Sequence, residues 1–345
     1  MPMNAQDLID TARQLMGVGK GILAMDESTG TCNQRFADAG IPQTEEARRS
    51  YRELIVTTPG LADSINGAIL YDETIRQRTK DGIPFVKVLT SAGIIPGIKV
   101  DAGAKDLAAR PGEKITEGLD GLRERLKEYS GMGARFAKWR AVIAIGDGIP
   151  SRGCIDANAQ ALARYAALCQ EAGIVPIVEP EVLIDGAHTL ERSREVTEET
   201  LRCLFNQLAS QNVMLEGMIL KPNMILPGLT CPSQASVNEI AAVTLKCLLA
   251  VVPAAIPGIA FLSGGQSAEL ATTRLNAMNV LAKSSVSRVP WPLVFSFARA
   301  IQQPALEIWR GKQDRVVAAQ EALRHRLRCN KAALQGEYNA AMEKM

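Results

Sequence analysis

The chain has little histidine and few aromatic side chains. Of its 345 residues only His188 and His325 are histidines, and Phe, Trp and Tyr together make up 4%. A zinc or iron centre built on several imidazoles is therefore not expected, nor is a serine or cysteine hydrolase that uses histidine as its base. Acid–base chemistry in this chain has to run on carboxylates, lysines or tyrosines. We expect no metal and no cofactor.

The sequence also lacks the marks of a secreted or membrane-bound protein. Its 7 cysteines form no C-x-x-C pair, and such an irregular set is typical of reduced thiols. Asp7 and Asp10 stand where a signal peptide would be apolar, and Pro253 and Pro257 interrupt the longest uncharged apolar run, Cys247–Leu262. A formal net charge of +2 gives no reason to expect a nucleic acid. We therefore expect a cytoplasmic protein without nucleic-acid or membrane partners.

Eight short apolar runs, most of them with a polar end, alternate with longer segments of helical periodicity. The runs are Gly21–Asp26, Gly67–Asp72, Ile94–Asp101, Phe136–Ile145, Ile174–Glu181, Met214–Lys221, Ile256–Ser263 and Pro292–Ala298. The clearest helical segments are Asn4–Met16, Thr44–Val56, Ala157–Ala172, Leu190–Gln211, Val237–Val251, Ala268–Leu281 and Ala305–Ala322.

This alternation predicts an α/β fold with a parallel sheet that is buried on both faces. Eight units suit a closed (β/α)8 TIM barrel better than an open doubly wound sheet. No G-x-G-x-x-G follows the first run, which disfavours dinucleotide binding. Because no low-complexity linker divides the chain, we expect one domain over residues 1–345, with an N-terminal helical segment and a C-terminal helical extension over roughly residues 313–345.

One basic residue stands where a strand should be apolar. Lys221 follows four residues suited to a buried strand and precedes Pro222, which pushes it into an extended conformation at the strand end. An amine held against an apolar interior favours its neutral form, and a neutral amine can attack a carbonyl to form a Schiff base. The alternative is a lysine whose side chain extends from the strand end into water.

Charged residues end several other strands of the predicted barrel. They are Asp26 and three pairs of residues two apart, Lys99 and Asp101, Lys138 and Arg140, and Glu179 and Glu181. Residues two apart on a strand point to the same face, and the C-terminal strand ends form the active-site face of this fold. A single charged strand end is ordinarily solvated, whereas several acids and bases that converge on one barrel mouth indicate a site.

The segment Ser263-Gly264-Gly265-Gln266-Ser267 follows the seventh run and precedes a helix. Glycines there let backbone N–H groups approach an anion, and the helix N-terminus adds a favourable dipole. Arg299, just past the eighth run, can add charge-assisted hydrogen bonds. A Gly-Gly pair can also be simply a tight turn, but its place in this fold favours a phosphate site.

Several of these segments resemble class I fructose-bisphosphate aldolase. The matching blocks are Leu23-Ala-Met-Asp-Glu-Ser-Thr-Gly30, Gly97-Ile-Lys-Val-Asp101, Ala137-Lys-Trp-Arg140, Ile177-Val-Glu-Pro-Glu181, Leu220-Lys-Pro-Asn-Met224 and Phe261-Leu-Ser-Gly-Gly-Gln-Ser267. The resemblance implies reversible, metal-independent aldol cleavage of fructose 1,6-bisphosphate to dihydroxyacetone phosphate and glyceraldehyde 3-phosphate, in glycolysis or gluconeogenesis. It also implies a homo-oligomer, a tetramer in many relatives.

The resemblance assigns roles by position. Lys221 matches the Schiff-base lysine, Glu179 and Glu181 the acid–base carboxylates, Asp26 the residue that helps deprotonate the C4 hydroxyl, and Lys138 the supporting cation. The positions that match one phosphate pocket are Ser263, Gly264 and Arg299, with Gly265 beside them. Those that match the other are Ser28, Thr31, Lys99 and Arg140, with Arg35 nearby.

The chain departs from the family in three places. Thr31 replaces a serine. Phe297-Ala298 replaces Tyr-Gly, and we expect the added methyl group of Ala298 to crowd a backbone N–H that binds phosphate. The last tyrosine is Tyr338, so the family's terminal tyrosine has no counterpart. The basic residues of the C-terminal extension are expected to form a solvated face: Arg315, Arg324, Arg326, Arg328 and Lys331.

Two other interpretations stay open. One is another Schiff-base barrel lyase, such as a transaldolase or a deoxyribose-phosphate aldolase, which would need a single phosphate pocket. The other is a barrel that binds a sugar phosphate or a protein without catalysis. Such a protein would have no use for Lys221.

Overall fold

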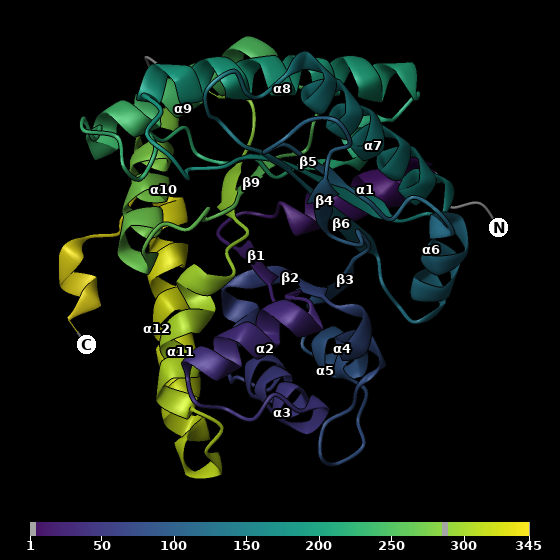
Figure 1. Cartoon of the computed structure of the whole chain (residues 1–345). Helices are drawn as coiled ribbons and strands as arrows, with labels where there is room; N and C mark the ends of the chain where they lie inside the picture. The colour runs from purple at the N-terminus through teal and green to yellow at the C-terminus, as the bar shows by residue number, and fades with distance from the viewer. Residues whose placement is uncertain (1–4, 285–288, 345) are drawn as a thin grey trace.

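The computed structural model describes residues 5–284 and 289–344, which form a barrel of eight parallel strands surrounded by helices (Figure 1). In their order around the sheet the strands are β1 (Gly21–Ala24), β2 (Ile65–Leu70), β3 (Ile95–Lys99), β6 (Phe136–Ile143), β7 (Val175–Val182), β8 (Ile219–Leu220), β9 (Ile259–Phe261) and β10 (Leu293–Phe295). Beyond β10 the Phe297 carbonyl oxygen accepts a 3.1 Å hydrogen bond from the Ala24 N–H, which closes the barrel. The predicted (β/α)8 fold is confirmed, and each predicted apolar run overlaps one of these strands.

Helices cover the outside of the barrel. They are α1 (Ala5–Leu15), α2 (Thr29–Asp38), α3 (Glu45–Val56), α4 (Asp72–Arg76), α5 (Phe85–Ser91), α6 (Leu122–Gly131), α7 (Arg152–Glu171), α8 (Leu190–Ser210), α9 (Val237–Val251), α10 (Ala268–Ala282), α11 (Arg299–Trp309) and α12 (Val316–Gln335). Four 3-10 turns complete the set: η1 (Leu61–Asp63), η2 (Leu215–Gly217), η3 (Gln313–Arg315) and η4 (Ala340–Glu343). No helix of the described part combines the length and the apolar character that crossing a membrane requires.

Aromatic side chains fit inside the barrel because nearby strands carry glycines, and Gly97 of β3 is paired directly with Phe136 of β6. A methyl group on Gly97 would overlap the Phe136 ring, and one on Gly67 would lie 3.0 Å from the same ring. A methyl group on Gly21 would lie 2.5 Å from the Phe295 ring. Interior packing leaves no room for an added carbon at such density. The glycines of the first three strands therefore make room for these aromatic rings in the core.

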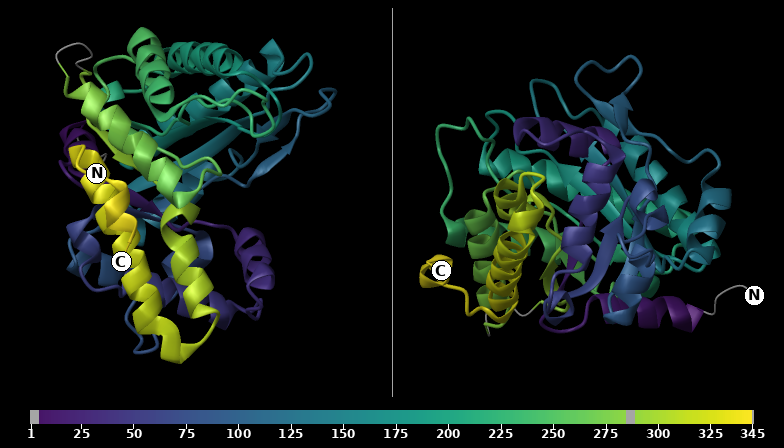
Figure 2. Two further views of the ribbon diagram at one scale, coloured as in Figure 1. Left: turned by 90° about the vertical axis from the view of Figure 1, so that its left-hand side faces the viewer. Right: turned by 90° about the horizontal axis from the view of Figure 1, so that it is seen from below.

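The prediction of one continuous helix over Ala305–Ala322 is wrong. In the structure α11 ends at Trp309, the chain reverses direction, and α12 begins at Val316, so that α11 and α12 form a hairpin beside the barrel (Figure 2). Arg310 and Gly311 cause the break, since their φ angles of 45° and 73° lie in the left-handed region, which cannot continue a right-handed helix.

Other differences are smaller. The hairpin of β4 (Ala104–Asp106) and β5 (Lys114–Thr116) was not predicted, and α7 starts at Arg152 instead of Ala157. Asn4, where the first helix was expected to begin, lies outside the described residues, and the described helix starts at Ala5. The expected solvated basic face of the C-terminal extension has one exception. Arg326 is buried and pairs with Glu343.

Candidate active site

Lys221 lies directly after β8, inside the barrel mouth. Its backbone N–H donates to the carbonyl oxygen of Val178 at 2.8 Å, so the parallel pairing with β7 continues through this residue. Pro222 then keeps the chain from turning into a helix. The Lys221 side chain is 4% exposed, and its Nζ atom lies 3.2 Å from Glu179 Oε1. The amine is buried beside a carboxylate, and the alternative of a side chain that extends into water is wrong.

Asp26, Lys138 and Glu179 form a row of alternating charges next to Lys221. Lys138 Nζ lies 2.7 Å from Asp26 Oδ2 and 3.4 Å from Glu179 Oε2. Burial alone would raise the pKa of the Asp26 carboxyl, but the charges of Lys138 and Lys221 outweigh it and hold that pKa below its usual value. Burial would also lower the pKa of Lys138, but Asp26 and Glu179 raise it above its usual value. Asp26 and Lys138 are therefore both ionised at neutral pH.

Two further ion pairs stand at the neighbouring strand ends. Glu181 Oε2 accepts a 2.5 Å hydrogen bond from Arg140 Nε. Lys99 Nζ donates to Asp101 at 2.5 Å to the side-chain Oδ1 and 2.9 Å to the carbonyl oxygen. The second oxygen of Asp101 accepts the Arg140 N–H at 3.2 Å. Asp101 thus fixes both the Lys99 ammonium and the backbone that carries Arg140.

Glu27, next to Asp26 in the chain, joins two arginines, and neither Glu27 nor Arg52 was identified from the sequence. One Glu27 oxygen accepts a hydrogen bond from Arg35, and the other accepts one from Arg52 Nη1 at 2.7 Å. Burial alone would raise the pKa of the Glu27 carboxyl, but Arg52 and Arg35 lower it. Arg52 lies on α3, 25 residues along the chain, where only the fold could reveal its partner. A charged residue directly after Asp26 was the one available signal for Glu27.

The loop after β9 has the geometry of an anion-binding turn. Gly264 and Gly265 have φ angles of 57° and 81°, a region that side-chain-bearing residues rarely adopt. Ser267 then caps α10 by accepting the Leu270 N–H. Arg299 begins α11 and has no hydrogen bond or ion pair among residues 5–284 and 289–344, so its guanidinium is available to a ligand.

A second anion-binding element lies at the start of α2. Ser28 caps this helix, and its Oγ accepts the Thr31 N–H at 3.3 Å. Arg35, one turn further along α2, donates hydrogen bonds to Glu27 and, through Nη2, to Gln303 Oε1 of α11 at 3.0 Å. Side-chain hydroxyls and unsatisfied N–H groups at a helix start suit an anion.

All the residues predicted for the site line one cavity of about 800 Å³ at the carboxyl ends of the strands. They are Asp26, Ser28, Thr31, Arg35, Lys99, Lys138, Arg140, Glu179, Glu181, Lys221, Ser263, Gly264, Gly265 and Arg299. The structure places them together; their individual roles remain predictions. Tyr338 does not line this cavity, and its hydroxyl donates to Glu343 at 2.7 Å.

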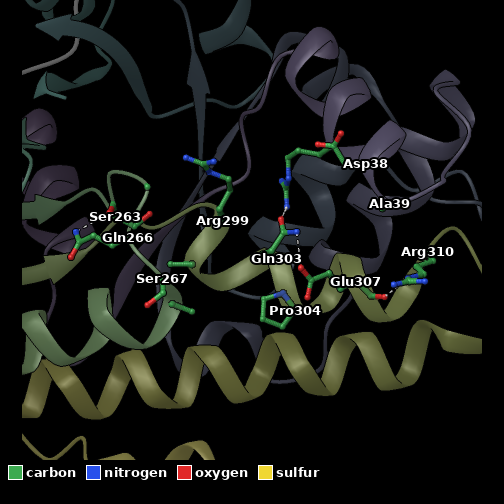
Figure 3. A pocket seen from close by; sticks show the side chains of 14 residues that line it. Asp38, Ala39, Ser263, Gln266, Ser267, Arg299, Gln303, Pro304, Glu307 and Arg310 are labelled. Atoms are coloured by element: carbon green, nitrogen blue, oxygen red, sulfur yellow. Dashed lines mark hydrogen bonds between the residues drawn. The ribbon is translucent and has the colours of Figure 1, made fainter. Parts of the chain in front are cut away.

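A second hollow, of about 680 Å³, adjoins the first between the loop after β9 and helices α2 and α11 (Figure 3). Figure 3 shows Arg299 between Gln266 of that loop and Gln303 of α11. Ser263, Gly265, Arg35 and Arg299 line both hollows, so these residues form the wall between them.

The cavity has further lining residues that the sequence did not indicate. Ser296 follows β10, and its Oγ is buried without a hydrogen-bond partner in the described part of the chain. Leu229 and Ile184 stand on two loops joined by the hydrogen bond from the Leu229 N–H to the Ile184 carbonyl at 2.8 Å. These loops add an apolar edge to an otherwise charged mouth. Ala298 also lines it, with a φ of −105° that needs no glycine.

A buried amine among carboxyl side chains, with anion-binding loops nearby, suits the cleavage or formation of a bond next to a carbonyl group in a phosphorylated compound. The fold and the cavity thus define a barrel enzyme of the lyase class.

Comparisons with known proteins identify the family. The model of the glycolytic class-I fructose-bisphosphate aldolase family matches residues 7–345. The chain belongs to this family and is a fructose-bisphosphate aldolase, a carbon–carbon lyase.

Individual relatives agree over the whole length. The probable fructose-bisphosphate aldolase class 1 of Xanthomonas axonopodis is 56% identical over 337 residues, 97% of this chain and 99% of that protein. The cytosolic fructose-bisphosphate aldolase 6 of Arabidopsis thaliana is 50% identical over 97% of this chain and 92% of its own. The structure of the Plasmodium falciparum aldolase, in complex with TRAP and an inhibitor, superimposes with a TM-score of 0.95 at 44% identity, over 99% of this chain and 98% of that one.

Proposed function

We propose that Lys221 is the nucleophile of this aldolase. Once it has given up a proton, its amine adds to the C2 carbonyl of fructose 1,6-bisphosphate, and loss of water leaves an iminium. The C3–C4 bond then breaks, its electron pair moves into the iminium to give an enamine, and glyceraldehyde 3-phosphate leaves. Protonation of the enamine and hydrolysis release dihydroxyacetone phosphate and the free amine. The observation that supports this role most directly is the burial of Lys221 Nζ beside Glu179 in the shared cavity.

Three carboxylates move the protons of this cycle. Asp26 takes the proton of the C4 hydroxyl as the carbon–carbon bond breaks, a task that its lowered pKa and its pairing with Lys138 support, since both keep it ionised. Glu179 and Glu181 serve the dehydration of the carbinolamine and the later proton transfers. Glu179 Oε2 is buried without a hydrogen-bond partner among the described residues and can accept a bond from a substrate hydroxyl or water.

The two phosphates are held on opposite sides of Lys221. One binds Ser263, Gly264, Gly265 and Arg299, and the other binds Ser28, Thr31, Lys99 and Arg140, with Arg35 alongside. Fixing both ends of the substrate places C2 against the amine, which lowers the entropic cost of the reaction. A lyase for monophosphates would have no use for the second group, which is the reason to prefer the bisphosphate.

Borohydride reduction in the presence of fructose 1,6-bisphosphate, followed by peptide mass mapping, tests the proposal. We expect a single adduct on Lys221, absent in Lys221→Met, and full activity in EDTA. An adduct on another lysine, or trapping that survives in Lys221→Met, would refute the assigned nucleophile.

We also propose that the enzyme works in the cytoplasm as a homotetramer, in glycolysis or gluconeogenesis. The cytosolic names of Arabidopsis relatives support the location, and the oligomeric state follows the family resemblance. Light scattering on the purified chain would give the mass, and a monomeric or dimeric value would contradict the tetramer.

A further inference from the structure

Three side chains with metal-binding atoms meet on the C-terminal extension, outside the catalytic cavity. His325 and Cys329 lie one turn apart on α12, and Glu343 of η4 packs against them. His325 Nε2 lies 3.7 Å from Cys329 Sγ and 3.5 Å from Glu343 Oε2, and the three ligand atoms lie within 4.8 Å of one another. We propose that this His–Cys–Glu cluster binds one divalent cation of the zinc type, with water as the fourth ligand.

Two of the three spacings between ligand atoms, those from His325 to Cys329 and to Glu343, fit a tetrahedral ion. Zinc bonds of about 2.0–2.1 Å to nitrogen and about 2.3 Å to sulfur, at a tetrahedral angle, separate the two ligand atoms by about 3.6 Å. The same reasoning gives about 3.4 Å between the nitrogen and a carboxylate oxygen. The distances of 3.7 Å and 3.5 Å differ from these values by only about a tenth of an ångström. Nitrogen, thiolate and carboxylate are also the ligand types that zinc prefers.

Neighbouring groups hold the carboxylate in place. Glu343 Oε2 accepts a hydrogen bond from Arg326, and Oε1 accepts one from the Tyr338 hydroxyl at 2.7 Å. A carboxylate oxygen has two lone pairs, so Oε2 can keep the Arg326 bond while it binds a cation. Hydrogen bonds of this kind orient the ligands of metal sites. The ion pair with Arg326 by itself would not need an imidazole and a thiol on its other side.

The ion would fasten the end of the chain. Glu343 comes from the segment after α12, which lies beside α10 and α12 at the edge of the molecule (Figure 1). The same segment is tied to α10 by the Tyr338 N–H, which donates to Asn276 Oδ1 at 3.0 Å. The side chains of His325 and Glu343 are 18% and 16% exposed, which gives an ion and its water access from solution. None of the three ligands lines the catalytic cavity, so the ion is structural and the aldol chemistry does not use it.

Cobalt(II) is a suitable probe because a thiolate ligand gives it a charge-transfer band. The full-length protein, reduced and treated with EDTA, is titrated with cobalt chloride and then with zinc chloride as competitor. We expect one equivalent of cobalt, a thiolate band that zinc removes, and a zinc-dependent rise in Tm. The band should be absent in Cys329→Ser. It should persist in Cys247→Ser, which alters a cysteine equally buried on another helix.

The proposal fails if the wild type takes up no stoichiometric cobalt, or if the band and the Tm rise survive in Cys329→Ser. Glu343→Gln is the second variant, since it keeps the shape of a partly exposed side chain and should weaken cobalt binding by about tenfold or more. Unchanged affinity in that variant would overturn the proposed ligand set. Aldolase activity shows that each variant is folded and should be the same with and without the metal.

Discussion

Glu179 Oε1 lies 3.2 Å from Lys221 Nζ, and the side chains of both residues are 4% exposed. The other oxygen of Glu179 lies 3.4 Å from Lys138 Nζ, so one carboxylate separates two amines in a buried space. Such a group can hold the nucleophile in position and can also carry protons to and from the carbinolamine. A glutamine would keep the size of the side chain but remove its negative charge and its ability to carry protons.

We therefore expect Glu179→Gln to lower kcat by about 10²- to 10⁴-fold, the usual contribution of a positioned acid–base group. The rate of borohydride trapping on Lys221 should fall in parallel, because iminium formation is the affected step. The matched control is Glu171→Gln, an exposed glutamate paired with Arg123, which should behave as wild type. Normal trapping with reduced kcat would restrict Glu179 to the later steps.

The pair of Asp26 and Lys138 predicts how stability depends on pH. Because the pKa of Asp26 is lower in the folded state than in the unfolded chain, this carboxylate stabilises the fold above its unfolded value of about 3.9. That contribution is lost as the pH falls through the folded pKa. In urea unfolding, the stability gap between wild type and Asp26→Asn should be full at about pH 6 and should narrow steadily below about pH 4. A gap independent of pH would mean that the pairing does not stabilise the fold.

The centre of the site could be predicted from the sequence because the signals of its residues are local. A lysine before a proline at the end of an apolar run marks Lys221, and spacing by two along one strand marks the Lys99–Asp101 pair. These inferences need only the strand period and the polarity of the barrel.

Contacts between distant segments were beyond the reach of the same reasoning. Arg52 is spaced four residues from Arg48 on α3, a pattern typical of an exposed helix face, yet it is buried against Glu27. The break between α11 and α12 was a different failure, since Gly311 is a residue type that commonly ends helices. The helical periodicity on both sides concealed this stop signal.

Lys99 should distinguish the two phosphates of the substrate. Its side-chain nitrogen is held by Asp101, and we propose that it binds the phosphate of the aldehyde half. A charge-assisted hydrogen bond is worth about 1.5–3 kcal/mol, so Lys99→Met should raise KM for fructose 1,6-bisphosphate by about 10- to 150-fold. Cleavage of fructose 1-phosphate should change little. Lys105→Met, an exposed lysine on the neighbouring hairpin, is the control; equal losses on both substrates would remove Lys99 from that pocket.

Two glycines with different surroundings should respond differently to an added methyl group. In Gly97→Ala the new methyl group overlaps the Phe136 ring, and such overpacking should reduce the free energy of unfolding by about 1–3 kcal/mol. Gly131 ends α6, and a methyl group there has nothing within 4 Å. Gly131→Ala should therefore be neutral or stabilising by up to about 1 kcal/mol. Urea unfolding measures both, and a harmless Gly97→Ala would show that the ring can move aside.

Gly265 and Gly82 share a backbone conformation but differ in their surroundings. Their φ angles are 81° and 80°, so an alanine at either position should cost a similar strain of about 1–2 kcal/mol. A methyl group on Gly82 meets nothing within 4 Å, whereas one on Gly265 lies 3.9 Å from an Arg299 guanidinium nitrogen and 3.6 Å from Ile184. It would occupy space that a phosphate on Arg299 needs.

Gly265→Ala should therefore raise KM for both fructose 1,6-bisphosphate and fructose 1-phosphate and weaken inhibition by inorganic phosphate. Gly82→Ala should leave all three constants unchanged, although both variants lose similar stability in urea. A raised KM for both substrates would distinguish this pocket from the one at Lys99, since both substrates carry the phosphate at C1. If Gly265→Ala loses stability but binds phosphate normally, the turn serves only to connect β9 to α10, and the anion must be held elsewhere.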